Sequence, residues 1–130
     1  MHLLKDAELI KTIAVPAAGA TAHTDILDLL QGPYQEAHFE VELKFPALPA
    51  LADGKSASAR LEDSADGVNF TAIAALEPLT VTGDGGDGSA EAVRKLRIPS
   101  DTRRYMRATV TADAGAGDNT ALKFSLALVF

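Results

Sequence analysis

Cysteine and tryptophan are absent from this chain of 130 residues, and aromatic residues make up only 5% of it. The absence of cysteine excludes a disulfide framework, a thiolate nucleophile and a cysteine-based zinc site. The absence of tryptophan, with so few other aromatic residues, disfavours a carbohydrate-binding surface built on exposed rings. Long apolar runs are missing as well, since none approaches the roughly 20 residues that a membrane-spanning helix needs.

A surplus of positive charge is also missing, because the formal net charge is −6 and the sequence pI is about 4.9. An acidic domain repels phosphate backbones, so general binding to nucleic acid is disfavoured. The first residues lack the basic start and long apolar stretch of a secretory signal peptide. We therefore expect one soluble domain, residues 1–130, made in the cytoplasm, with no nucleic acid and no membrane among its partners.

The chain does contain a regular alternation of apolar and polar residues. Between residues 36 and 45 every second residue is apolar, which predicts a strand with one dry and one wet face. Residues 122–130 repeat the pattern, but their second face becomes apolar toward the end, which predicts cover from another element or another subunit. Weaker strands are expected near residues 10–15, 25–29, 56–63, 68–74, 79–82, 93–98 and 104–112.

Turn-forming residues separate these segments at regular intervals, and helix signals are poor. The best helical candidate, residues 26–31, is a single turn ended by Gly32 and Pro33. Short strands separated by turns predict an all-β fold, an antiparallel β-sandwich of about 8–9 strands that is jelly-roll-like. Because much of the apolar share is alanine, the core between the sheets should be thin and rich in small residues.

No group of residues has the spacing of a catalytic or metal site, so we expect neither an enzyme nor a cofactor. The histidines His2, His23 and His38 are scattered through the first third of the chain, without the i, i+2 or i, i+4 spacing of metal ligands. His38 lies on the polar face of its predicted strand and is interpreted as exposed.

Two acidic segments offer chemical alternatives. Residues 83–89 combine aspartate and glycine, but a calcium site needs about six to eight oxygen ligands. Only Asp84 and Asp87 are close together, so a flexible loop is preferred to a calcium site. Paired carboxylates hydrolyse glycosides only when they face each other across a cleft. Turn capping is therefore preferred to catalysis for the carboxylates beside the Asp-Gly turn, which are Glu62, Asp63 and Asp66.

Basic residues are concentrated in residues 94–107, which hold half of all the lysine and arginine. Three interpretations follow in order of preference: a solvated strand face, a surface that docks onto an acidic protein, and a nucleic-acid site. Tyr105 and Met106 begin the next strand and are expected in the core. The candidates for partner binding are the arginines that follow the turn at Pro99, which are Arg103, Arg104 and Arg107.

Three blocks of the sequence carry a resemblance to a known family. They are residues 21–29, with Thr-Ala-His-Thr-Asp-Ile-Leu-Asp-Leu; residues 61–70, with Leu-Glu-Asp-Ser-Ala-Asp-Gly-Val-Asn-Phe; and residues 96–110, with Pro-Ser-Asp-Thr-Arg-Arg-Tyr-Met-Arg inside. In this order they resemble the small capsid cement, or decoration, proteins of tailed bacteriophages, of the Bordetella-phage type. The chain departs from the pattern at Phe70, where a tryptophan is often found, and in a longer loop at residues 83–89.

The resemblance implies a jelly-roll-like, non-enzymatic subunit on the outer surface of a phage or prophage capsid. There it would form a homo-oligomer, most simply a trimer, and stabilise the shell by binding the major capsid protein. Two alternatives stay open: another structural β-sandwich of a phage head or tail, and a glycan-binding module. A neighbouring major capsid gene would favour the first interpretation, and a place within a larger secreted chain would favour the last.

Overall fold

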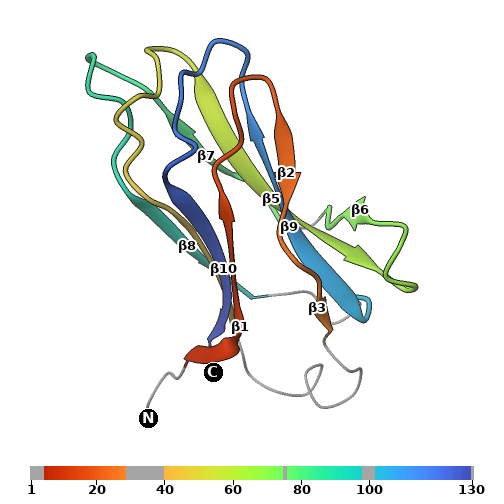
Figure 1. The fold of residues 1–130 in the computed structure, drawn as a ribbon. Helices are drawn as coiled ribbons and strands as arrows, with labels where there is room; N and C mark the ends of the chain where they lie inside the picture. Colours follow the sequence, from red (N-terminus) through yellow and green to blue (C-terminus); the bar gives the residue numbers. More distant parts are fainter. Residues whose placement is uncertain (1–4, 29–39, 75, 98–101, 130) are drawn as a thin grey trace.

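The computed structural model describes residues 5–28, 40–74, 76–97 and 102–129, which form two layers of antiparallel strands (Figure 1). Sheet A consists, in order, of β1 (Lys5–Ala14), β10 (Lys123–Val129), β4 (Glu40–Phe45) and β8 (Ala92–Leu96). Sheet B has β9 (Tyr105–Ala112) and β5 (Ser56–Ser64) at its centre, flanked by β2 (Thr21–His23), β3 (Leu27–Asp28), β6 (Thr71–Ala72) and β7 (Leu79–Thr82). The predicted all-β sandwich is confirmed. No helix of the described residues is long and apolar enough to cross a membrane.

The strand order is that of a jelly roll. The short strands β2 and β3 pair with successive parts of β9, and β7 and β6 pair with successive parts of β5. If each such pair counts as one position, the ten strands occupy eight positions, in the orders 1-8-3-6 and 2-7-4-5. The first position pairs with the last, the second with the seventh, and so on inward. That nesting results when one long antiparallel ribbon wraps into two Greek keys.

Large and small side chains face each other across the core. On sheet A the inner faces of β4 and β10 present fully buried large residues: Val41, Leu43, Phe45, Phe124, Leu126 and Leu128. The rings of Phe45 and Phe124 lie 5.0 Å apart between centroids. On sheet B the inner faces of β5 and β9 are mostly small: Ala57, Ala59, Ala108, Val110 and Ala112. The alanine residues of sheet B thus lie opposite large residues of sheet A, and the core is rich in small residues on one layer only.

The loop of residues 83–89 packs against the preceding long loop at one end of the sandwich. Leu48 and Ser89 form an isolated antiparallel bridge, and the backbone N–H of Gly86 donates to Asp53 Oδ1 at 2.9 Å. Gly88 has a φ of +71°, and a β carbon there would overlap the carbonyl oxygen of Leu48. These contacts join the loop to its neighbour, and the flexibility expected for it stays a prediction. Among the described residues, no three metal-ligating side chains converge on one point.

Several predicted segments differ from the observed strands. The strand expected at residues 25–29 is present as β3, which pairs with the start of β9, so the weak helical candidate at 26–31 is not helical in its described part; residues 29–31 lie outside the described residues. The strand expected at 68–74 is reduced to β6, with Ile73 buried rather than its neighbours. Residues 36–39 of the strand expected at 36–45 lie outside the described residues, and so do His2, His38 and Phe130. On the outer side of β10, Ala127 is only 3% exposed.

Candidate interaction surface

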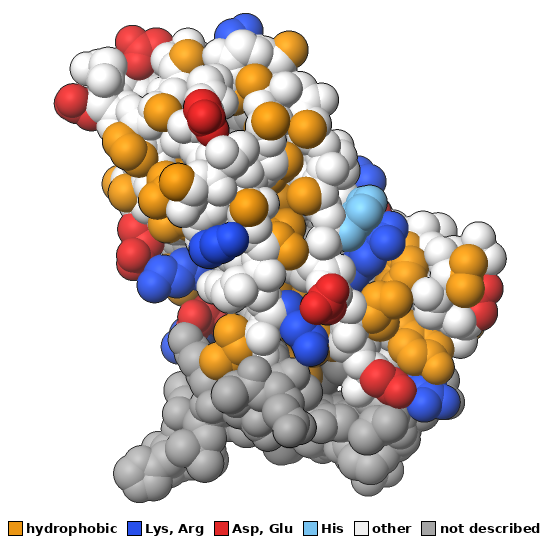
Figure 2. All heavy atoms as spheres, viewed as in Figure 1, with side chains coloured by type: hydrophobic (Ala, Val, Ile, Leu, Met, Phe, Trp, Pro, Cys, Tyr) orange, Lys and Arg blue, Asp and Glu red, His pale blue; other side chains and the backbone are white. Residues whose placement is uncertain are grey.

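The basic stretch of residues 94–107 is divided between the two sheets. Arg94 lies in β8 of sheet A, where its guanidinium donates to the carbonyl oxygen of Pro78 at 3.0 Å. Arg107 lies in β9 of sheet B, and Arg103 and Arg104 directly precede that strand. On the face drawn in Figure 2, Lys and Arg side chains accordingly lie at several separate places rather than in one block. The stretch is therefore not one continuous strand face.

Arg103 fastens the start of β9 to the end of β5. Its Nη2 lies 2.8 Å from Asp63 Oδ1, and its backbone N–H donates to Asp63 Oδ2 at 3.0 Å. Burial alone would raise the pKa of Asp63, but the hydrogen bonds and charge of Arg103 outweigh it, and the pKa falls below its ordinary value. Arg103 thus has an intramolecular partner, although its own side chain is 40% exposed.

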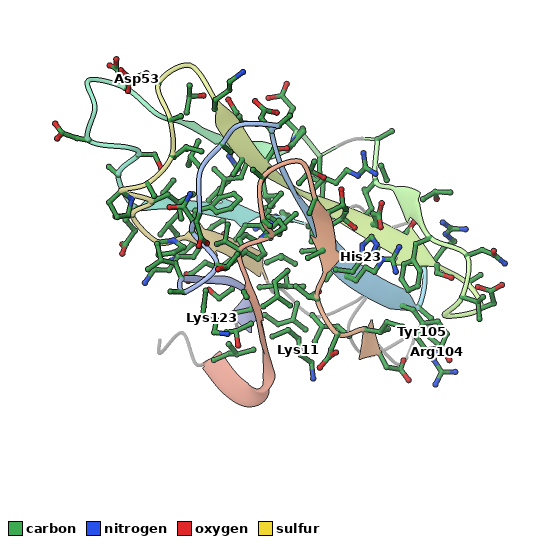
Figure 3. The ribbon with its side chains drawn as sticks, turned by 45° about the horizontal axis from the view of Figure 1, so that its top comes forward. Lys11, His23, Asp53, Arg104, Tyr105 and Lys123 are labelled. Carbon is green, nitrogen blue, oxygen red and sulfur yellow. The ribbon has the colours of Figure 1, made fainter. Side chains whose placement is uncertain are left out.

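Arg104 makes the corresponding connection to β3, on the other side of β9. Its Nε and Nη2 donate to the two oxygens of Asp28, each at 2.8 Å, in a bidentate pair. The same guanidinium lies 5.1 Å from the centre of the Tyr105 ring, and Figure 3 shows the two side chains next to each other. Tyr105 is half-buried on the outer face, whereas Met106 is fully buried, so the core position expected for both is confirmed only for Met106.

Glu62 lies at the centre of the outer face of sheet B, with its side chain only 7% exposed. Its Oε1 accepts from Thr109 Oγ1 at 2.6 Å and from Arg107 Nε at 2.9 Å, while Oε2 accepts from Arg60 Nη2 at 3.2 Å. Burial alone would raise the pKa of Glu62, but these hydrogen bonds and the two positive charges hold it below its ordinary value. One carboxylate therefore serves two arginines.

His23 extends this network onto β2. Its Nδ1 lies 2.8 Å from Thr109 Oγ1. Because the single proton of that hydroxyl points to Glu62, the histidine Nδ1–H must be the donor. His23 itself is exposed, and Figure 3 labels its position beside β2.

The turn between β5 and β6 is held rigidly. Six hydrogen bonds among Ser64, Asp66, Gly67, Val68 and Asn69 close it, with Asp66 Oδ1 accepting from the backbone N–H groups of Val68 at 2.8 Å and Asn69 at 2.9 Å. The backbone hydrogen bonds from Asn69 and Val68, followed by the Ser64 hydroxyl, hold the pKa of Asp66 far below its ordinary value. The predicted turn capping is confirmed for Asp66. It is wrong for Glu62 and Asp63, whose carboxylates bind arginine instead.

The turn then lies across the outer face of β9. The guanidinium carbon of Arg107 is 4.1 Å from the centre of the Phe70 ring, and a β carbon at Gly67 would be 3.6 Å from the Tyr105 ring. Val68, at the tip, is 77% exposed. We call the group of Arg60, Val68, Phe70, Tyr105 and Arg107 the hairpin face; on this side of the molecule, hydrophobic and positively charged side chains adjoin (Figure 2).

The partner-binding candidates Arg103, Arg104 and Arg107 therefore all make intramolecular ion pairs, and their role toward a partner stays a prediction. Arg60 and Val68 are more exposed, and neither was singled out from the sequence. The sequence contains one signal that this turn lies against the sheet, which is the aromatic residue Phe70 after the Asp-Gly pair.

Comparison with known proteins adds little. No protein-family model matches the chain, and no curated protein matches it. Among solved structures, the chain is similar to the crystal structure of PirA, with a TM-score of 0.49 and 11% sequence identity over 95% of this chain and 94% of that one. A likeness of this size carries no functional argument.

Proposed function

We propose that the protein is a non-enzymatic structural subunit of a phage or prophage virion. It decorates the outer surface of the capsid, binds the major capsid protein and stabilises the shell. It is made in the cytoplasm of the bacterial host and acts there as a homo-oligomer, most simply a trimer.

The observation that carries this proposal is the meeting of the three resembling blocks in sheet B. The bidentate pair between Arg104 and Asp28 joins the third block to the first. The pairs that Arg103 makes with Asp63, and Arg107 with Glu62, join the third block to the second. Motifs that are separate in the sequence are thus one connected structural unit, as expected if the resemblance reflects a shared fold rather than three coincidences.

The use of the acidic side chains in this unit also supports a structural role. Glu62, Asp63 and Asp28 each bind an arginine, and Asp66 binds backbone N–H groups. A general acid or base must exchange its proton with a substrate near neutral pH. Carboxylates that are held ionised by their neighbours suit a rigid scaffold better.

The test is rebinding to shells that lack the protein. The gene would be deleted from the phage or prophage that carries it, and purified protein added to the resulting capsids. We expect saturable co-sedimentation with the shells and a higher temperature of shell disruption. An oligomer larger than 13.6 kDa is expected by light scattering, either free or on the shell. Shells that neither bind the protein nor gain stability would refute the proposal.

A further inference from the structure

We propose that the hairpin face is a docking surface for an acidic segment of a partner protein. If the partner is the major capsid protein, the inference rests on the proposed function. The surface itself is argued from four features of the described residues: a carboxylate shared by two arginines, free donors, a rigid turn and an exposed apolar tip.

The two arginines at the centre of the hairpin face have one carboxylate partner between them. Arg60 and Arg107 share the single carboxylate of Glu62, while a further carboxylate of the hairpin, Asp66, binds the Ser64 hydroxyl, backbone N–H groups and Asn69 rather than an arginine. Elsewhere on this sheet the arginines have a carboxylate each, Asp63 for Arg103 and Asp28 for Arg104. A second carboxylate, supplied from outside, would complete the central group.

The two arginines also keep hydrogen-bond donors for such a carboxylate. Arg107 binds Glu62 through Nε, and its two Nη groups have no partner among the described residues. Arg60 binds Glu62 through Nε and Nη2, and its Nη1 has no hydrogen-bond partner among the residues that the structure describes. The Phe70 ring, 4.1 Å from the Arg107 guanidinium carbon, fixes the plane of that group. A fixed guanidinium loses less entropy when it binds a carboxylate bidentately.

The apolar part of the surface is equally preorganised. Val68 is 77% exposed, yet it is held on a turn that six hydrogen bonds close. Tyrosine, phenylalanine and arginine are the residue types enriched at protein–protein interfaces, and rigid presentation raises affinity by lowering the entropy cost. An apolar tip next to a positive site fits a protein segment that carries carboxylates beside an apolar side chain.

A nucleic acid fits this surface less well. Bases bind by stacking on open aromatic faces, but Arg107 occupies one face of Phe70 and Gly67 packs against Tyr105.

The test compares matched substitutions on the two sheets. On the hairpin face we would make Val68→Glu and Arg60→Gln, which leave the Asp66 turn and the Arg107–Glu62 pair in place. The controls on β8 of sheet A are Val93→Glu and Lys95→Gln, because Val93 is 48% exposed and Lys95 is also exposed. Melting temperatures of all four variants should stay close to that of the parent, which separates binding from folding.

Affinity for capsids that lack the protein is measured for each variant at low and high salt. We expect Val68→Glu to weaken binding about tenfold or more and Arg60→Gln about fivefold, with changes under about twofold for the controls. Binding should weaken as salt rises, because exposed charge pairs are screened. Equal effects on both sheets, or larger effects from the β8 variants, would overturn the docking surface while leaving the proposed function intact.

A second measurement does not depend on capsids. A tetraglutamate peptide is titrated into ¹⁵N-labelled protein, and shifts are expected at the Nε–H signals of Arg60 and Arg107 and at the amides of the turn, reduced in Arg60→Gln. Shifts confined to other regions, or none at several millimolar peptide, would overturn the inference even where capsids bind. Tighter binding of a thymidine oligonucleotide at the same residues would replace the acidic protein with nucleic acid as the partner. Failure of the parent to bind capsids, with these shifts present, would refute the capsid role alone.

Discussion

The substitution Glu62→Gln should destabilise the protein, although it exchanges only one oxygen atom of the side chain for nitrogen. The glutamine amide keeps the shape of the side chain but removes its charge and replaces one acceptor with a donor. In the structure both carboxylate oxygens face donors, from Thr109 and Arg107 on one side and Arg60 on the other. An amide nitrogen placed on either side therefore meets another N–H or O–H group.

The magnitude follows from the exposure of the three charged groups. Glu62 is 7% exposed, whereas Arg107 is 23% and Arg60 is 54% exposed. Breaking a fully buried ion pair costs about 3–5 kcal/mol, and each hydrogen bond to a charged group contributes about 1.5–3 kcal/mol. Water reaches the arginines and recovers part of this, so we expect a loss of about 2–3 kcal/mol. For a domain of this size the melting temperature should fall by roughly 6–12 °C.

Urea unfolding at pH 7 measures this loss, provided that the denaturant slope is the same in both proteins. The matched control is Glu91→Gln, because Glu91 also faces a cation, Lys44 at 3.7 Å, but the two side chains are 58% and 43% exposed. Such a pair contributes at most about 0.5–1 kcal/mol. If Glu62→Gln lies within about 0.5 kcal/mol of the control, the network around Glu62 does not stabilise the fold as argued.

Three further outcomes are expected. The folded-state pKa values of Glu62 and Asp63 lie below the ordinary 4.5 and 3.8, so their contribution to stability is complete above about pH 5 and is lost as the pH falls through the folded values. Urea unfolding at a series of pH values should show this loss of stability, and Glu62→Gln should lose less stability over the same pH range. Gly88→Ala should lower the free energy of unfolding by about 2–4 kcal/mol, because the new β carbon overlaps a neighbouring backbone and the φ is strained. Gly85→Ala should lower it by only about 1–2 kcal/mol, because its φ is +63° but open space surrounds it. Equal losses of stability for the two variants in calorimetry would contradict this. Calcium should leave the melting temperature unchanged, whereas a site at the loop of residues 83–89 would raise it by several degrees at about a hundredfold excess over its dissociation constant.

Much of the fold could be predicted because its long strands carry their own pattern. The alternation that places Val41, Leu43 and Phe45 in the core is visible in the sequence, and β7 matches its predicted bounds. The strand β2 could not be found in this way, since three residues are too few to show a period. It and β3 exist because β9, which follows them by about 80 residues, offers hydrogen bonds along its whole length.

The interaction surface could be predicted only in part. An Asp-Gly pair between two strands indicates a turn, and Asp66 closes it as expected. The partners of the arginines had no local signal, because Asp63, Glu62 and Asp28 lie 40, 45 and 76 positions away from the arginines that they bind. Arg103 and Arg104 are consecutive, yet they bind carboxylates on opposite neighbours of β9, namely β5 and β3. Treating the basic stretch as a single strand face does not predict this arrangement.

The position of β10 within sheet A has a consequence for synthesis. β10 lies between β1 and β4, so these two strands belong to one sheet only once β10 has paired with both. When a nascent chain has emerged from the ribosome only as far as β9, all strands of sheet B are present, but sheet A still lacks β10. The strand β4 then has no partner on the side where β10 will pair. Pairings between segments so distant in the chain also form slowly. Sheet A is therefore completed only when β10 has paired with both β1 and β4.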